Sequence, residues 1–200
     1  MQPSTIVSTS RHLSWLLRHG AIQSSLPMDT AGWCSIESVL TMANISRALL
    51  DEVVAKNNKS RLQVDGDRIR ASQGHSRDGT PVTQAALEAS WSLWTSTDSL
   101  WHGTHSKVIA SIAREGLLAQ GRTHVHLAES LESTVGKRSG VVLMLEIDPE
   151  RVRAAGQSIY RSPNGVILTR HVPPAGIIDL HPLSRRAKRA APELRSMLGL

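Results

Sequence analysis

The sequence contains no phenylalanine, one tyrosine and one cysteine among its 200 residues. Because aromatic residues make up only 3% of the chain, aliphatic side chains must fill the core, with five tryptophans as its bulky members. The single cysteine, Cys34, excludes an intramolecular disulfide and any zinc site built on paired cysteines. These absences favour a protein of a reducing compartment that is stabilised by hydrophobic packing.

Long apolar runs are also missing. No segment is long enough to span a bilayer, and the first residues lack the basic-then-apolar order of a signal peptide. We therefore expect a cytoplasmic monomer without a membrane partner.

Charge is unevenly distributed along the chain, which carries a net +6. The first hundred residues hold equal numbers of basic and acidic side chains, and much of the excess lies in Arg185, Arg186, Lys188, Arg189 and Arg195. A basic surface attracts polyanions such as RNA. A solvated helix end explains the same residues, so charge alone does not establish this partner.

The first part of the chain has the pattern of three helices followed by a hairpin. A leucine stripe predicts a helix that ends at Gly20, and further helices are expected over 35–42 and 46–56. Asp65-Gly66 predicts a tight turn between two strands. This outline is typical of a winged helix, a domain that commonly contacts nucleic acid.

The second part consists mainly of predicted strands, over 100–104, 125–128, 141–148, 158–161, 166–172 and 177–180. Helices are expected over 107–114 and 129–136. The fold class is therefore α+β. We expect an N-terminal lobe over 1–76, a linker over 77–98 that includes a short helix over 84–94, a second lobe over 99–183 and a basic tail over 184–200.

Arg18 and His19 lie at the predicted C-terminal end of the first helix, where the helix dipole favours cations and keeps His19 protonated. Arg11 lies two turns earlier, on about the same face. Such residues suit a phosphate site, although for the pair taken alone simple C-terminal capping is the better explanation.

Arg68 and Arg70 alternate along the hairpin, so their guanidinium groups share one face, which suits phosphate oxygens. Gly74 permits a sharp turn that leaves His75 and Ser76 as exposed donors. A solvated strand face followed by a loop is the alternative.

In the second part, His102-Gly103-Thr104 ends an apolar strand, and the backbone at Gly103 can approach a planar amide such as nicotinamide. His124 and His126 share a strand face but lack further metal ligands at a recognised spacing, so we expect no metal. Arg138 lies in a glycine-flanked loop.

Taken in order, these segments resemble the RNA 2′-phosphotransferase family, from about Ser10 to Ile178. The resemblance is carried by Leu-Ser-Trp-Leu-Leu-Arg18-His19, Asp29…Gly32-Trp33, Lys59-Ser-Arg-Leu, Ile69-Arg70-Ala-Ser-Gln-Gly-His-Ser76, His102-Gly-Thr104, His124-Val-His-Leu-Ala128, Gly136-Lys-Arg138-Ser-Gly140 and Ser162-Pro-Asn-Gly-Val-Ile-Leu-Thr169. Each segment is weak alone, but eight in this order are specific.

The resemblance implies a winged-helix lobe that holds RNA and an ADP-ribosyltransferase-like lobe that binds NAD⁺, the co-substrate. In the family reaction, an internal RNA 2′-phosphate attacks the nicotinamide ribose, and a ribose hydroxyl then attacks the phosphate. The products are nicotinamide, RNA with a free 2′-OH and ADP-ribose 1″,2″-cyclic phosphate.

The resemblance also implies residue roles. Arg18 and Arg70 bind the 2′-phosphate, His19 orients it and donates a proton, and Arg138 bridges the phosphate and the NAD⁺ ribose. The NAD⁺-site residues carried over are His102, Gly103, Thr104 and His126, together with Gln73, His75 and Ser76.

Two alternatives remain open on the sequence. The protein could stop after the first step and ADP-ribosylate a phosphorylated nucleic-acid end or a protein. It could also be a winged-helix regulator that binds nucleic acid and whose second lobe has lost its activity.

Overall fold

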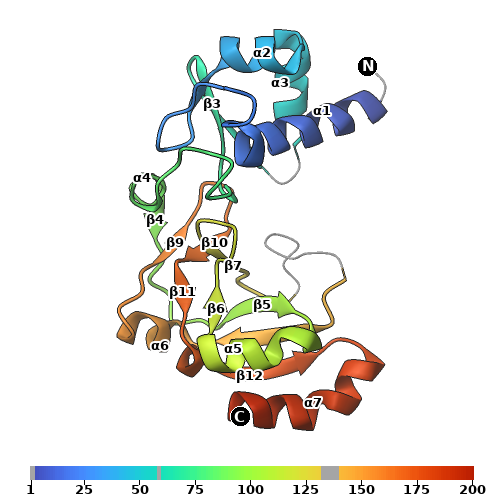
Figure 1. Ribbon diagram of the computed structural model, residues 1–200, viewed down its shortest axis with the longest axis vertical. Coiled ribbons are helices and arrows are strands. Elements are labelled where there is room, and N and C mark those ends of the chain that lie inside the picture. Colours follow the sequence, from blue (N-terminus) through green and yellow to red (C-terminus); the bar gives the residue numbers. More distant parts are fainter. Residues whose placement is uncertain (1–2, 58–59, 132–139) are drawn as a thin grey trace. The chain divides into compact units, whose positions relative to one another are not determined.

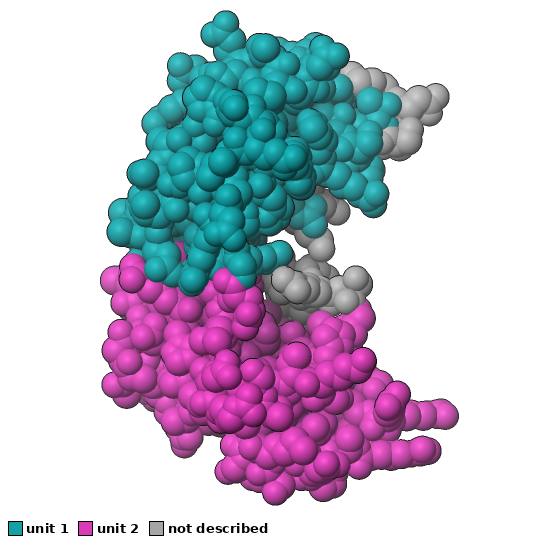
Figure 2. All heavy atoms as spheres, in the orientation of Figure 1, with its two compact units in different colours: residues 1–92, 121–123, 162–164 teal, residues 93–120, 124–161, 165–200 magenta. Residues whose placement is uncertain are grey.

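The computed structural model describes residues 3–57, 60–131 and 140–200 (Figure 1). The chain forms two compact units, which Figure 2 shows in different colours. Unit 1 comprises residues 1–92, 121–123 and 162–164, and unit 2 comprises 93–120, 124–161 and 165–200. The boundary at residue 92 lies within the predicted linker, whose first part, over 77–92, belongs to unit 1.

The helices of unit 1 are α1 (Pro3–Trp15), its continuation η1 (Leu16–Gly20), α2 (Ile36–Ala43), α3 (Arg47–Ala55) and α4 (Gln84–Glu88). The predicted helices over 35–42 and 46–56 are confirmed, and their starts have a local cause. Ser35 and Ser46 each cap a helix by accepting a hydrogen bond from the backbone three residues on. The predicted helix over 84–94 is real but ends at Glu88.

A three-stranded antiparallel sheet of order β1-β3-β2 completes unit 1, with β1 at Cys34–Ser35, β2 at Leu62–Asp65 and β3 at Arg68–Ala71. The predicted hairpin is confirmed, and Gly66 takes the positive φ of 60° that its tight turn requires. Leucine, isoleucine and valine side chains from α1, α2, α3 and β3 form one buried cluster. This cluster fixes α1 and the hairpin relative to each other.

Unit 2 is built around two main antiparallel sheets, of orders β12-β8-β5 and β4-β9-β10-β7, and a two-stranded sheet β11-β6. The strands are β4 (Ser92–Leu93), β5 (Leu100–Thr104), β6 (Leu117–Leu118), β7 (Val125–Leu127), β8 (Leu143–Ile147), β9 (Ile159–Arg161), β10 (Ile167–Thr169), β11 (His171–Val172) and β12 (Ile177–Pro182). All six strand predictions are confirmed, the one over 166–172 as two short strands. The fold is therefore α+β, as expected.

Helices η2 (Ser106–Val108), α5 (Ile109–Glu115), α6 (Pro149–Ala154), η3 (Pro174–Gly176) and α7 (Arg185–Leu198) pack around these sheets. The predicted helix over 107–114 is confirmed, whereas most of the one over 129–136 lies outside the described residues. In the described part of the chain, no helix is both long and apolar enough to cross a membrane.

The segment predicted as a basic tail forms helix α7, which packs on unit 2. Ser184 caps its start, and Ala187, Ala191 and Leu194 are buried in the core of the unit. Near its end, Arg195 donates hydrogen bonds to the Asp179 carboxylate at 2.9 Å and to the Leu180 carbonyl at 2.5 Å. The helix is thus held by one apolar face and one partly exposed ion pair.

Candidate phosphate and nucleotide sites

Arg18 and His19 lie in η1, a single π-helical turn that extends α1. Such turns are rare in proteins and are frequent at functional sites. Gly20 ends this turn in direct contact with the indole of Trp15. A Cβ at this position would lie only 2.6 Å from the ring, so no larger residue fits without a shift. The glycine predicted as a stop signal therefore has a second role, which is to let the turn pack on an aromatic ring.

The loop over 72–80 holds this turn in place. The backbone N–H and the hydroxyl of Ser76 both donate to the Arg18 carbonyl, at 2.8 Å and 3.2 Å. A Cβ at Gly74 would lie 3.6 Å from the Arg18 guanidinium carbon, and a Cβ at Gly79 would lie 2.0 Å from the His19 carbonyl oxygen. Ser76 and Gly79 therefore fix the backbone of the Arg-His pair, while Gly74 lies in van der Waals contact with the Arg18 side chain.

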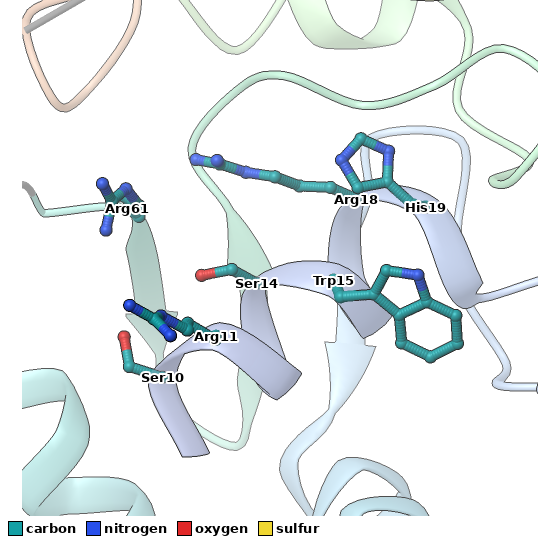
Figure 3. Close-up of a pocket in the computed structure, with 7 residues that line it drawn as sticks. All are labelled: Ser10, Arg11, Ser14, Trp15, Arg18, His19 and Arg61. Atoms are coloured by element: carbon teal, nitrogen blue, oxygen red, sulfur yellow. The ribbon is translucent and has the colours of Figure 1, made fainter. Parts of the chain in front are cut away.

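A pocket of about 380 Å³ opens beside this pair, lined by Ser10, Arg11, Ser14, Trp15, Arg18, His19 and Arg61. In Figure 3, the guanidinium groups of Arg11, Arg18 and Arg61 gather with the Ser10 and Ser14 hydroxyls on one side of the view. Trp15 and His19 lie on the other side. Three arginines line the pocket and no carboxylate does, so its chemistry suits an anion.

The Arg18 guanidinium is the least satisfied group of the pocket. Its Nε and Nη2 atoms, like the Ser14 hydroxyl, are buried without a hydrogen-bond partner among the described residues. Burial first, and repulsion from Arg61 and Arg122 second, lower the pKa of Arg18 to about 10. The group stays charged at neutral pH, and a bound anion would supply both the missing acceptors and the missing counter-charge.

The expected charge of His19 is corrected by the structure. Burial, followed by repulsion from Arg122 and Arg18, lowers the pKa of His19, so that the neutral imidazole is favoured in the free protein. Burial, with the charges of two arginines added to it, therefore opposes the helix dipole, which favours the charged form. An anion in the pocket would shift the equilibrium back toward the imidazolium.

Arg70 is held quite differently, by the protein itself. Its side chain is 3% exposed, and Nε donates to Gln63 at 2.9 Å. Its Nη1 donates to the Ala31 carbonyl at 3.1 Å and to the Ser90 hydroxyl at 2.9 Å. Only Nη2 makes no hydrogen bond with a described residue, and Arg70 does not line the pocket around Arg18.

Arg68 and Arg70 do share one face of the hairpin, as predicted. Their guanidinium carbons lie 5.0 Å and 4.4 Å from the centre of the Trp33 ring, at distances typical of cation–π contacts. Arg68 is also paired with Asp65 at 3.0 Å. The common face is therefore occupied by an aromatic ring.

The expected exposed donors after Gly74 are corrected too. The sharp turn exists, with φ of 90° at Gly74, but His75 is fully buried and Ser76 is partly buried. Gln73, just before the turn, is 7% exposed. The His75 ring packs beside Gly32, where a Cβ would lie 2.9 Å from its Nε2 atom. The loop folds into unit 1, where Ser76 donates to the Arg18 carbonyl. No local sequence pattern predicted this contact with Arg18.

In unit 2, two of the predicted nucleotide-site residues are brought together. His102 on β5 places its Nδ1 atom 3.0 Å from the carbonyl oxygen of His126 on β7, a contact that fixes the imidazole ring. Thr104 is 6% exposed, and a Cβ at Gly103 would lie 2.8 Å from the Val141 side chain. The backbone of Gly103 is therefore covered by Val141 on the side where a Cβ would lie, next to the oriented His102 ring.

Arg138 lies outside the described residues. The pocket is also lined by residues for which the sequence patterns predicted no role, namely Ser10, Ser14, Trp15 and Arg61, and Arg122 was not predicted either. Arg61 belongs to the Lys59-Ser-Arg-Leu segment, which carries part of the family resemblance. The spacing of Arg11 from Arg18 did predict that the two share one face of the helix. Arg122 carried no signal, because its loop joins unit 1 only through tertiary contacts such as that between Arg77 Nε and its carbonyl, at 3.0 Å.

The pocket so described has a lining that suits an anion, in a protein of α+β fold. A family model described as RNA 2′-phosphotransferase, Tpt1/KptA family, matches residues 4–171, and the chain belongs to that family. It is 37% identical over 186 residues to a probable RNA 2′-phosphotransferase of Acaryochloris marina, covering 86% of this chain and 96% of that protein. Proteins of the same name from Pseudomonas syringae pv. tomato (39% identity, 82% and 89% covered) and Hahella chejuensis (38%, 88% and 96%) are similarly related.

Proposed function

We propose that the protein transfers an internal RNA 2′-phosphate to NAD⁺. In the first step, a phosphate oxygen attacks the anomeric carbon of the nicotinamide ribose, and the bond to nicotinamide breaks. This step gives a 2′-phospho-ADP-ribosylated RNA. In the second step, the neighbouring ribose hydroxyl attacks phosphorus, and its proton goes to the departing RNA 2′-oxygen. RNA with a 2′-OH and ADP-ribose 1″,2″-cyclic phosphate result.

The observation that supports this proposal most strongly is the partly buried guanidinium of Arg18, whose Nε and Nη2 atoms are buried without a hydrogen-bond partner among the described residues. A cation without a counter-charge is unfavourable in a folded protein, unless a ligand provides the counter-charge. The phosphate monoester at an RNA 2′ position carries two negative charges and fits a pocket with three guanidinium groups.

The chemistry needs little beyond such a pocket. The attacking phosphate is already an anion, so the first step requires positioning rather than a strong base. The second step spreads charge over phosphorus, which fixed guanidinium groups stabilise without titrating. His19, neutral in the free pocket, gains a proton more readily once the phosphate binds, and we assign it the orientation of the phosphate and proton donation.

We further propose that unit 1 is the winged-helix lobe that holds RNA and that unit 2 is the ADP-ribosyltransferase-like lobe that holds NAD⁺. The order of three helices and a hairpin in unit 1 supports the first assignment. His102, Gly103, Thr104 and His126 would contact NAD⁺, while Arg70, through its remaining Nη2 atom, and Arg138 would contact the phosphate. We expect the reaction in the cytoplasm, where RNA and NAD⁺ are both available.

The test is to incubate the protein with NAD⁺ and an oligoribonucleotide that bears one internal 2′-phosphate. We expect dephosphorylated RNA, nicotinamide and ADP-ribose cyclic phosphate in equal amounts. The same RNA without the 2′-phosphate is the control and should release no nicotinamide. A stable ADP-ribosylated product without cyclic phosphate would favour an ADP-ribosyltransferase, and the absence of nicotinamide release would refute the proposal.

A further inference from the structure

Helix α7 presents a cluster of cations that the site described above does not include. Four of the first five positions of the helix are basic, and all four side chains are exposed: Arg185, Arg186, Lys188 and Arg189. At 3.6 residues per turn they cover about 160° of the helix circumference, opposite the buried side. We call these four residues the basic face of α7.

The fold gains nothing from the basic face. The four side chains are three and four residues apart, so like charges face one another, and they lie at the positive end of the helix dipole. The first turn has no acidic residue, and none of the four makes an ion pair or hydrogen bond with a described residue. The helix forms because Leu194 and its neighbours are buried and because Arg195 is anchored to Asp179.

We propose that the basic face of α7 is a second RNA-binding surface, which contacts backbone phosphates without reading sequence. The inference rests on the proposed function for the identity of the polyanion. Helix α7 lies beyond residue 171, where the match to the family model ends, so the surface is separate from the segment that defines the family.

RNA fits this surface better than a lipid bilayer does. A helix that binds a membrane surface inserts an apolar face between the lipids. The apolar face of α7 is instead occupied, since Ala187, Ala191 and Leu194 are part of the unit 2 core. What remains exposed at its start are the charged ends of long side chains, which suit phosphates held at the surface.

The test is the salt dependence of RNA binding by the full chain, measured without NAD⁺ on a 2′-phosphorylated oligoribonucleotide. Each cation that contacts a single strand contributes a slope of about −0.7 to log K against log salt. The variant R185Q/R186Q/K188Q/R189Q should therefore lose a slope of about 2 to 3 and should bind roughly 10-fold or more weakly at low salt. Each pair, R185Q/R186Q or K188Q/R189Q, should lose about half of this slope.

A matched control removes two exposed cations from elsewhere in unit 2. Arg114 and Arg151 are 71% and 59% exposed, and R114Q/R151Q should leave the slope unchanged. The variant R185K/R186K/R189K should also keep the slope, because it keeps the charge. No variant should melt below the wild type, because the basic face does not stabilise the helix, and all should keep the kcat at saturating RNA.

An unchanged slope in the quadruple variant would overturn the proposal. It would also be overturned if R114Q/R151Q lost as much slope as R185Q/R186Q or K188Q/R189Q. Loss of binding to phosphatidylserine vesicles with an unchanged RNA slope would assign the surface to membranes instead, and would also overturn it. RNA binding is measured without NAD⁺, so it does not depend on catalysis. If the slope depends on the basic face of α7 but the phosphotransfer assay fails, only the proposed function is refuted.

Discussion

Two arginines of unit 1, the half-buried Arg18 and the buried Arg70, differ in what surrounds them. Arg70 has two side-chain acceptors, one backbone acceptor and an aromatic ring, all supplied by the protein. Arg18 has Nε and Nη2 atoms that no described residue satisfies, and its nearest charged neighbours are other arginines. A partnered guanidinium stabilises the fold, whereas an unpartnered one destabilises it until a ligand supplies the missing acceptors and counter-charge. The two positions can therefore be separated by measuring stability and activity on the same variants.

The largest expected effect on activity belongs to Arg18. The variant Arg18→Ala should lower kcat/KM for 2′-phosphorylated RNA by roughly 10²- to 10³-fold, as loss of one charge-stabilising donor commonly does. Its free energy of unfolding should stay level or rise, because a buried charge without a partner is removed. Arg47→Ala, on the exposed surface of α3, is the control that should change neither quantity. A clear loss of stability in Arg18→Ala would contradict our description of the pocket.

The largest expected effect on stability belongs to Arg70. Arg70→Ala should lower the free energy of unfolding by about 2–3 kcal/mol, because it leaves buried acceptors unpaired beneath Trp33. If Arg70 also acts on the phosphate, the second chemical step should slow more than the first, and ADP-ribosylated RNA should accumulate. Urea unfolding and analysis of the RNA products check the two parts separately. Equal slowing of both steps would leave Arg70 a purely structural role.

A smaller effect is expected at Gly79, which contacts the Arg18–His19 turn only through its backbone. Gly79→Ala should cost about 1–3 kcal/mol in stability and should lower kcat, because its Cβ would have to displace the His19 carbonyl. Gly121→Ala, at a glycine with open space around it, is the matched control and should be nearly neutral. If both variants behave alike, the close approach at His19 does not matter for activity.

The smallest expected effect is a pH dependence set by His19. Because the pKa of His19 is lowered in the folded protein, the unfolded chain takes up the proton first as pH falls below about 6.5. This group therefore lowers stability on acidification, and His19→Gln should flatten that part of the stability curve. Inorganic phosphate should bind more tightly as pH falls through the pKa of His19, since the imidazolium adds a charge. A phosphate affinity with the same pH dependence in wild type and His19→Gln would contradict this role.

The sequence predicted the elements well because their signals are local. Serine caps set the starts of α2 and α3, and Asp65-Gly66 set the hairpin turn. The spacing of Arg11 and Arg18 likewise predicted that both would reach one pocket. Each of these depends on residues close together in the chain, where propensity and periodicity act directly.

The errors arose where a residue depends on distant neighbours. Ser76 was expected to be an exposed donor, but it donates twice to Arg18, 58 residues away in sequence. The charge of His19 was inferred from its own helix, whereas Arg122, which reaches unit 1 from a later loop, dominates among the charges that act on it. No local pattern encodes such encounters.

By itself, then, the sequence determined the element types, the family and the residues that carry charge, because these follow from composition, local propensity and the order of short motifs. Only the tertiary structure decided which of those charges are already neutralised. Desolvation and the supply of hydrogen-bond partners are properties of the packed surroundings, and they make Arg70 a supported cation and Arg18 an unsatisfied one.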